Sequence, residues 1–224
     1  RNLEIVFETF ARQFSTVLSS SLRVVSHVEL QGIEQRTYDE YVTDAPNPTH
    51  LIVLALPPLP GPAVMQLPPA VAFTMVELLL GGHGSGAAPK RQLTEIEVSI
   101  VDTLVPRALD ELTYAFESVL RLYPPITQHE SKPQFAQIVA PSDMTVVISL
   151  SVKLDDTEGN VTFCLPYTTL QPVLESFSQA HHLRQFEAAG AIAIGNRRVA
   201  RAVVQGNLDV LEHRQRRPHA RLEI

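Results

Sequence analysis

The sequence predicts a mixed α/β domain of the α+β class: a pseudo-two-fold symmetric, three-layer α/β/α domain made of two similar halves, about 1–80 and 93–178. Two observations predict it. Each half contains a long amphipathic helix, then strands joined by a turn, then a helix opened by proline. The matching prolines, Pro68 and Pro166, lie 98 positions apart. We therefore expect one mostly antiparallel sheet built from both halves, with the two long helices packed together on one face.

The first half begins with a helix, because apolar residues recur every three or four positions and so share one face. These residues are Leu3, Phe7, Phe10, Phe14 and Val17. The elements expected next are strands over 27–33, 50–56 and 61–67 and a helix over 70–80. Pro68 and Pro69 open that helix at positions where a missing N–H costs nothing.

The second half begins with a capping box. The Thr94 hydroxyl can accept a hydrogen bond from the Glu97 N–H while the Glu97 carboxylate reaches back to the N–H of Thr94. The apolar residues of the following helix are Ile96, Ile100, Leu104, Leu112, Phe116 and Val119. Pro106 should kink or divide this helix. The elements expected last are strands over 146–153 and 160–165 and a helix from Pro166 through Phe177.

Charge and composition exclude several classes of function. The net charge is −6, but residues 181–224 carry eight Arg against four acidic residues, a net of +4, so the rest of the chain has a net of −10. An acidic body does not suit nucleic acid, because phosphate binding needs a basic face. Cys164 is the single cysteine and fits a reducing, cytoplasmic compartment. No stretch approaches the roughly 20 apolar residues of a membrane span.

A glycine-rich loop, Gly-Gly-His-Gly-Ser-Gly at residues 81–86, joins the two halves. It follows a helix and has no Lys-Ser/Thr pair, so it is not a nucleotide-binding loop; an exposed polar loop suits binding of another protein. We expect Gly81 or Gly82 to end the preceding helix in a left-handed conformation. Gly84 lacks that role and would instead allow the backbone of a partner to approach closely. His83 either contacts the partner directly or responds to pH near the free pKa of about 6.5, or it is an exposed histidine whose identity matters little, which is the favoured interpretation.

Three segments resemble the middle domain of the FliM family of flagellar motor switch proteins. They are Gly81-Gly82-His83-Gly84, Leu93-Thr94-Glu95-Ile96-Glu97 and Pro133-Gln134-Phe135-Ala136-Gln137-Ile138-Val139. The resemblance covers about residues 1–178 and implies a pseudo-symmetric fold related to the CheC and CheX chemotaxis phosphatases. It also implies that the chain docks the rotor protein FliG. The loop residues that would do so are Gly81, Gly82, His83, Gly84 and Ser85.

The resemblance implies further partners and a location. The family forms the cytoplasmic ring at the base of the rotor, so we expect this chain at the flagellar basal body, on the inner face of the cell membrane, relaying chemotaxis signals to rotor direction. Neighbouring FliM copies would meet through the long helices, about 3–22 and 94–120. FliN would bind a C-terminal module. Phosphorylated CheY would bind an N-terminal peptide that we expect this chain to lack. The basic segment 179–224 is either a partial or divergent FliN-like (SPOA) module or an ordered tail.

The kinship with phosphatases raises an alternative function, dephosphorylation of CheY. CheC-like enzymes carry Glu-x-x-Asn on each long helix, and the amide orients the attacking water. Here Glu8 is followed by Ala11, and Glu111 by Tyr114, so neither helix supplies that amide. We therefore expect a non-enzymatic module with no catalytic residue and no cofactor. A type III secretion ring component is a further alternative, and the Gly-Gly-x-Gly loop and residues 133–139 favour the flagellar one.

No metal site is expected from the sequence. His181 and His182 are adjacent, so on a helix they would point in different directions, whereas helical metal ligands lie three or four residues apart. His213 and His219 are too loosely placed to complete a site.

Overall fold

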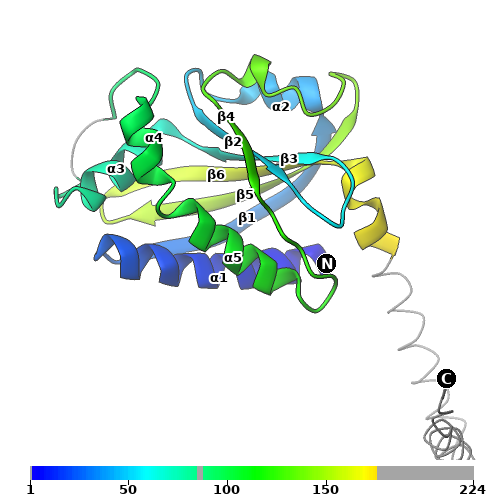
Figure 1. Ribbon diagram of the computed structural model, residues 1–224, viewed down its shortest axis with the longest axis horizontal. Helices are drawn as coiled ribbons and strands as arrows, with labels where there is room; N and C mark the ends of the chain where they lie inside the picture. Colours follow the sequence, from blue (N-terminus) through cyan, green and yellow to red (C-terminus); the bar gives the residue numbers. More distant parts are fainter. Residues whose placement is uncertain (1, 85–87, 176–224) are drawn as a thin grey trace, which may run out of the picture. The chain divides into compact units, whose positions relative to one another are not determined.

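The computed structural model describes residues 2–84 and 88–175 (Figure 1). The sequence predictions for Ser85, for the end of the last helix and for the basic segment 179–224 lie outside these ranges. The helices are α1 (Asn2–Leu22), α2 (Tyr38–Asp44), α3 (Pro69–Leu79), α4 (Glu95–Val101) and α5 (Val105–Phe116), with a 3-10 helix η1 at Pro133–Phe135 and a further helical segment at 167–175. The strands are β1 (Ser26–Thr37), β2 (His50–Ala55), β3 (Pro62–Leu67), β4 (Ile126–Glu130), β5 (Met144–Leu154) and β6 (Thr157–Pro166).

The strands form one antiparallel sheet in the order β1-β5-β6-β3-β2-β4. The order is symmetric about its centre, because β6 and β3 lie in the middle, β5 and β2 come next, and β1 and β4 form the two edges. Each edge strand therefore pairs with the hairpin of the other half of the chain. This exchange of edge strands confirms the predicted pseudo-two-fold fold and makes one sheet out of two similar units.

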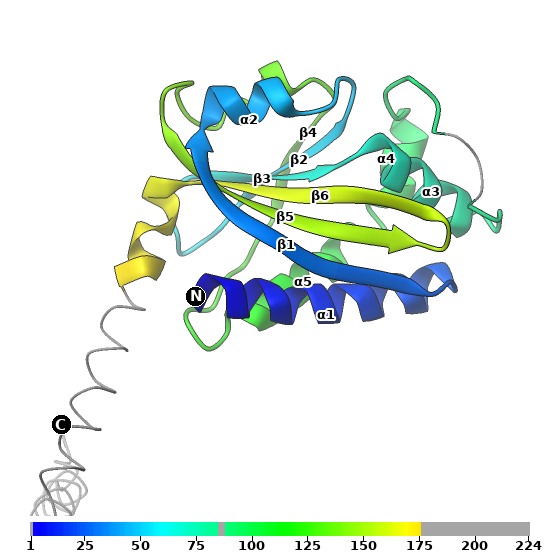
Figure 2. The ribbon, with the colours of Figure 1, turned by 180° about the vertical axis from the view of Figure 1, so that it is seen from behind.

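Helices cover the two faces of the sheet, as Figures 1 and 2 show from opposite sides. α1 and α5 pack on one face, and α2 and η1 lie over the other, which gives the three expected layers. Phe7 on α1 joins the layers: its ring lies 6.0 Å from Phe116 of α5 and 5.7 Å from Phe163 of β6. Aromatic pairs at such separations contribute about 0.5–1.5 kcal/mol beyond the area they bury. Among the described residues, no helix is long and apolar enough to cross a bilayer.

The opposite face of the sheet has a smaller core around two tyrosines of α2. Tyr38 donates its hydroxyl to the Ala136 carbonyl oxygen after η1, and Tyr41 is hydrogen-bonded to the Thr162 hydroxyl at 3.3 Å. Cys164 of β6 is buried in the same cluster, and this burial raises the pKa of its thiol to about 12. Burial likewise raises the pKa of Tyr38 to about 12. These groups remain neutral at physiological pH, so the thiol is an inert part of the core.

Several sequence predictions need correction. Leu18, not Val17, continues the buried face of α1, because the helical repeat of 3.6 residues moves the face by one position after Phe14. Pro106 divides the second long helix, as predicted, but Ile96, which was expected on its apolar face, is 75% exposed on α4. α5 ends at Phe116, before Val119.

Strand β1 is longer than the predicted 27–33 and reaches Thr37. A bulge between Leu30 and Gly32 adds one residue to β1 opposite β5, and pairing then continues to Met144. The prediction stopped early because residues 34–37, Glu-Gln-Arg-Thr, include no apolar side chain that would mark a strand.

Candidate partner-binding site

The loop after α3 begins as a tight helix end. Gly81 has φ +86°, and its N–H donates to the Leu78 carbonyl at 3.0 Å, while the Gly82 N–H donates to the Glu77 carbonyl at 2.9 Å. These two bonds form a Schellman motif, which requires a residue in the left-handed conformation after the helix cap. The predicted helix-ending glycine is therefore Gly81, and the motif determines the direction in which the chain leaves α3.

Gly84 attaches the loop to the rest of the fold on the far side of the exposed loop residues. Its φ is +70°, it is buried, and a Cβ placed there would lie 3.1 Å from Leu78 Cδ2 and 3.3 Å from Thr74 Cγ2. Its carbonyl oxygen accepts a hydrogen bond from the Thr157 hydroxyl at 3.3 Å. Gly84 does not end the helix, as predicted, but it has a local role that the sequence did not reveal, because both its backbone conformation and its packing against α3 call for glycine.

The part of the loop that faces solvent is short. Gly81, Gly82 and His83 are exposed, and Leu80, the cap residue of α3, is 71% exposed beside them. The sequence analysis did not single out Leu80, although an apolar residue directly before a glycine pair at a helix end is the signal that would have found it. The loop therefore offers a partner one apolar side chain, one imidazole and a glycine backbone. Ser85, the last predicted contact, lies outside the described residues.

The positions that correspond to the phosphatase motif are occupied by unsuitable side chains. Ala11 is 3% exposed and faces the core of the first layer, while Glu8 is exposed on the outer side of α1. On α5, Glu111 is half-buried and Tyr114 is 57% exposed. Neither helix presents a carboxamide at the position from which it would orient a water molecule.

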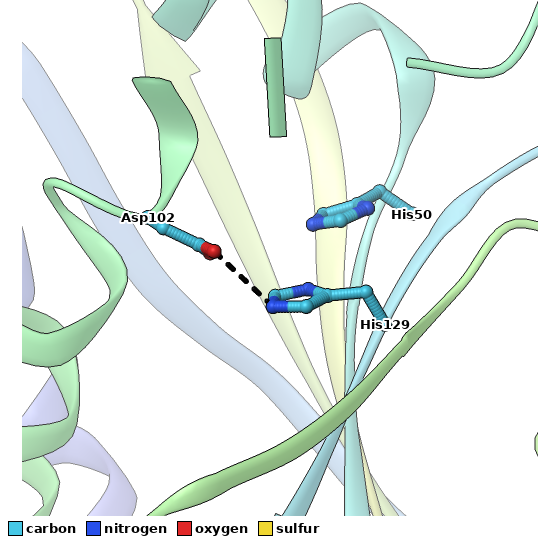
Figure 3. A group of neighbouring side chains, drawn as sticks. All are labelled: His50, Asp102 and His129. Carbon is cyan, nitrogen blue, oxygen red and sulfur yellow. Dashed lines mark ion pairs between the residues drawn. The ribbon is translucent and has the colours of Figure 1, made fainter. Parts of the chain in front are cut away.

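A second cluster was missed by the sequence analysis. His50 at the start of β2, Asp102 at the C-cap of α4 and His129 on β4 come together beside the sheet (Figure 3). Asp102 Oδ2 lies 3.2 Å from His129 Nε2, and the rings of His50 and His129 stack at 5.3 Å between centroids. The three positions are far apart in the sequence, so only the pairing of β2 with β4 reveals them. His129 lies opposite Ile52, two residues after His50.

The sequence of this domain matches a known protein family. The family model described as "Flagellar motor switch protein FliM" matches residues 1–182. The chain belongs to the FliM family. FliM of Treponema pallidum is 39% identical to it over 178 residues, which are 80% of this chain and 52% of that protein. The chain thus spans about half the length of the curated relatives that it matches.

Solved FliM structures share the fold. A chain of the FliG–FliM complex from H. pylori superposes with a TM-score of 0.76 at 28% identity, and the match covers 78% of this chain and 96% of that one. The FliM middle domain of Vibrio alginolyticus superposes with a TM-score of 0.71 at 26% identity, covering 79% of this chain and 99% of that one. The region that matches is therefore the FliM middle domain, as the sequence predicted.

Proposed function

We propose that this chain is a non-enzymatic component of the flagellar motor switch that docks FliG through the loop of residues 81–85. The observation that carries the proposal is the loop itself: a Schellman motif fastens one side and buried Gly84 the other, so that an exposed tip is held in place. The FliM of H. pylori has been solved in complex with FliG, and its fold matches this one.

The fastened loop suits a docking role for an energetic reason. Ordering a free loop on binding reduces affinity, whereas a loop already held in its bound form avoids this cost. Two hydrogen bonds at the end of α3 and one from Thr157 hold the backbone on both sides of His83. The missing side chains of Gly81 and Gly82 allow a partner to approach the backbone between these anchors.

The same proposal includes neighbouring copies of this chain as partners. The outer layer carries exposed apolar side chains on both long helices, Ile5 on α1 at 56% and Tyr114 on α5 at 57% exposure. Beside α5 lies an apolar hollow lined by Pro106, Leu109 and Tyr123. A ring would place this layer between adjacent copies at the basal body, on the cytoplasmic face of the membrane. FliN would bind through the basic segment 179–224 if that segment is a SPOA module. Phosphorylated CheY would bind a separate N-terminal peptide.

The alternative functions have less support. A CheC-like phosphatase would need an exposed amide at the positions of buried Ala11 and of Tyr114. The FliM match over residues 1–182 supports the flagellar assignment over a type III secretion ring.

In the proposed motor switch, a tilt of the whole domain as a rigid body is the simplest switching motion. A regulator can select one of two orientations if their free energies lie within a few kcal/mol.

The test is a calorimetric titration of the chain with the middle domain of FliG. His83→Trp places bulk at the exposed tip without touching the fastened glycines, and Gln35→Trp places the same bulk at an exposed position near the far end of β1. We expect saturable binding by the parent and by Gln35→Trp, and binding at least tenfold weaker by His83→Trp. Equal affinity of the three proteins would show that FliG does not contact the loop.

A further inference from the structure

The cluster of His50, Asp102 and His129 has three buried polar atoms without hydrogen-bond partners among the described residues. They are His50 Nε2, Asp102 Oδ1 and His129 Nδ1. His50 is only 5% exposed. A buried polar atom that makes no hydrogen bond costs about 1–3 kcal/mol, so three in one cluster call for an explanation by a ligand.

We propose that these three residues bind a divalent transition-metal ion, with Zn²⁺ as the first candidate. Two imidazoles and one carboxylate form a ligand set that suits Zn²⁺ and its neighbours in the first transition row. The three side chains can each offer one ligand atom, and these atoms lie within 4.8 Å of one another. The proposal concerns a site away from the loop and does not depend on FliG docking.

The geometry shows what metal binding changes. Bonds of about 2.0–2.2 Å hold tetrahedral ligands roughly 3.4 Å apart, so the cluster has to contract. The rings of His50 and His129 are stacked with an angle of 11° between their planes (Figure 3), and an ion cannot lie in both of two parallel planes. One imidazole therefore turns about its Cβ–Cγ bond when the ion binds. The turn is compensated because the ion satisfies buried atoms that otherwise have no partner.

The surroundings favour a cation and leave room for it. His50 and His129 line a pocket of about 420 Å³ together with two acidic residues, Glu95 and Glu130, whereas Asp102 lies outside this lining. The pocket is open to solvent on this side, so water or a carboxylate can complete the coordination.

The position of the site suggests its structural effect. Asp102 caps α4, which follows the glycine loop in the chain, whereas His50 and His129 lie on the neighbouring strands β2 and β4. A bound ion would therefore connect α4 directly to the edge of the sheet. In its absence, the ion pair of Asp102 with His129 is the direct polar link that the described residues show within the cluster.

The experiment is a calorimetric titration of the chelator-treated full chain with Zn²⁺, accompanied by Co²⁺ absorption and by thermal unfolding. We expect one ion to bind at this site, a tetrahedral or five-coordinate Co²⁺ spectrum, and a rise in Tm that EDTA reverses. Asp102→Asn keeps the shape of the side chain and should weaken Zn²⁺ binding at least tenfold. His129→Gln should have the same effect.

The controls separate this site from the other histidines. His27→Gln alters an exposed histidine on β1, and a double variant, His181→Gln with His182→Gln, alters the adjacent pair; both should bind Zn²⁺ as the parent does. If His129→Gln fails to fold, Asp102→Asn decides, because Asp102 is only half-buried. Absence of Zn²⁺ binding would overturn the proposal. So would binding that survives Asp102→Asn in a folded protein, which would leave the cluster as an ion pair only.

Discussion

Thr157 on β6 donates its hydroxyl to the carbonyl oxygen of Gly84 at 3.3 Å. The bond joins the loop after α3 to the β5–β6 hairpin of the other half of the fold, 73 positions along the chain. The same hydroxyl is 3.1 Å from that of Thr74, so the Thr74 hydroxyl donates to Thr157, and Thr157 donates its own hydroxyl hydrogen to the Gly84 carbonyl. The two halves thus share the anchor of the proposed docking loop.

Thr157→Val tests this anchor, because it keeps the shape of the side chain and removes the hydroxyl. We expect the free energy of unfolding to fall by about 2 kcal/mol, because the hydroxyl makes two hydrogen bonds of about 1 kcal/mol each, and FliG to bind more weakly because the loop is less ordered. Urea unfolding and calorimetry measure the two effects. Thr127→Val is the control, because it removes a hydrogen bond far from the loop. This bond joins the Thr127 hydroxyl on β4 to the Val53 carbonyl on β2 at 3.1 Å. Equal affinity for FliG in both variants would contradict the role of the anchor.

Gly84→Ala and Gly81→Ala separate backbone strain from packing. Both glycines have positive φ, at +70° for Gly84 and +86° for Gly81. Backbone strain in either alanine variant should therefore destabilise the folded state by about 1–2 kcal/mol. Only Gly84 has neighbours within 4 Å of the added Cβ, so we expect Gly84→Ala to lose more stability than Gly81→Ala in urea unfolding. Equal losses would mean that Leu78 and Thr74 move aside without cost. For the same reason Gly84→Val would be a poor test of docking.

Much of the fold was predictable because its signals are local. The periodic apolar face of α1, the capping box at Thr94, and the break at Pro106 each depend on a few neighbouring residues, and the structure confirms all three. The repeated order of elements was enough to predict a symmetric sheet. The FliM match over residues 1–182 confirms the family resemblance on which the proposed function rests.

The missed elements have weaker or non-local signals. α2 is only seven residues long, although Thr37 and Glu40 form a capping box that a closer search would have found. β4 is an edge strand of five residues, and its sequence, Ile126–Glu130, lacks a long apolar run. The cluster of His50, Asp102 and His129 exists only because β4 crosses to the hairpin of the first half, and no spacing along the chain reveals such a crossing.

The capping box of α4 gives a pH prediction. Arg91 pairs with the Glu97 carboxylate at 2.7 Å, and this hydrogen bond, with those from Thr94, lowers the pKa of Glu97 from its usual 4.5 to about 2. A carboxyl whose pKa falls on folding adds stability that is fully present above pH 4.5 and is lost as the pH falls toward 2.

Glu97→Gln should therefore be less stable than the parent at pH 7, and the difference should shrink between about pH 4.5 and 2. Urea unfolding over that range measures it. Glu95→Gln is the control, an exposed acid in the same first turn. A difference between parent and Glu97→Gln that stays constant over the range would show that the carboxylate charge contributes nothing to the folded state.

The phosphatase alternative can be tested by restoring the missing amides. Ala11 is 3% exposed among the aromatic residues of the first layer, so Ala11→Asn places a carboxamide inside the core. We expect it to lose about 3 kcal/mol of stability, from the extra volume and from polar atoms without partners. Tyr114→Asn alters a side chain that is 57% exposed and should change stability by about 0.5 kcal/mol or less.

Neither variant, nor the two combined, should release phosphate from phosphorylated CheY, because the amide on α1 points away from water. Glu8 is exposed, but the burial of Ala11 shows that its side of α1 is used for packing, whereas a phosphatase needs both residues of its Glu-x-x-Asn motif at the surface. Phosphate release by Tyr114→Asn alone would contradict this, since it would mean that one amide on α5 is sufficient for hydrolysis.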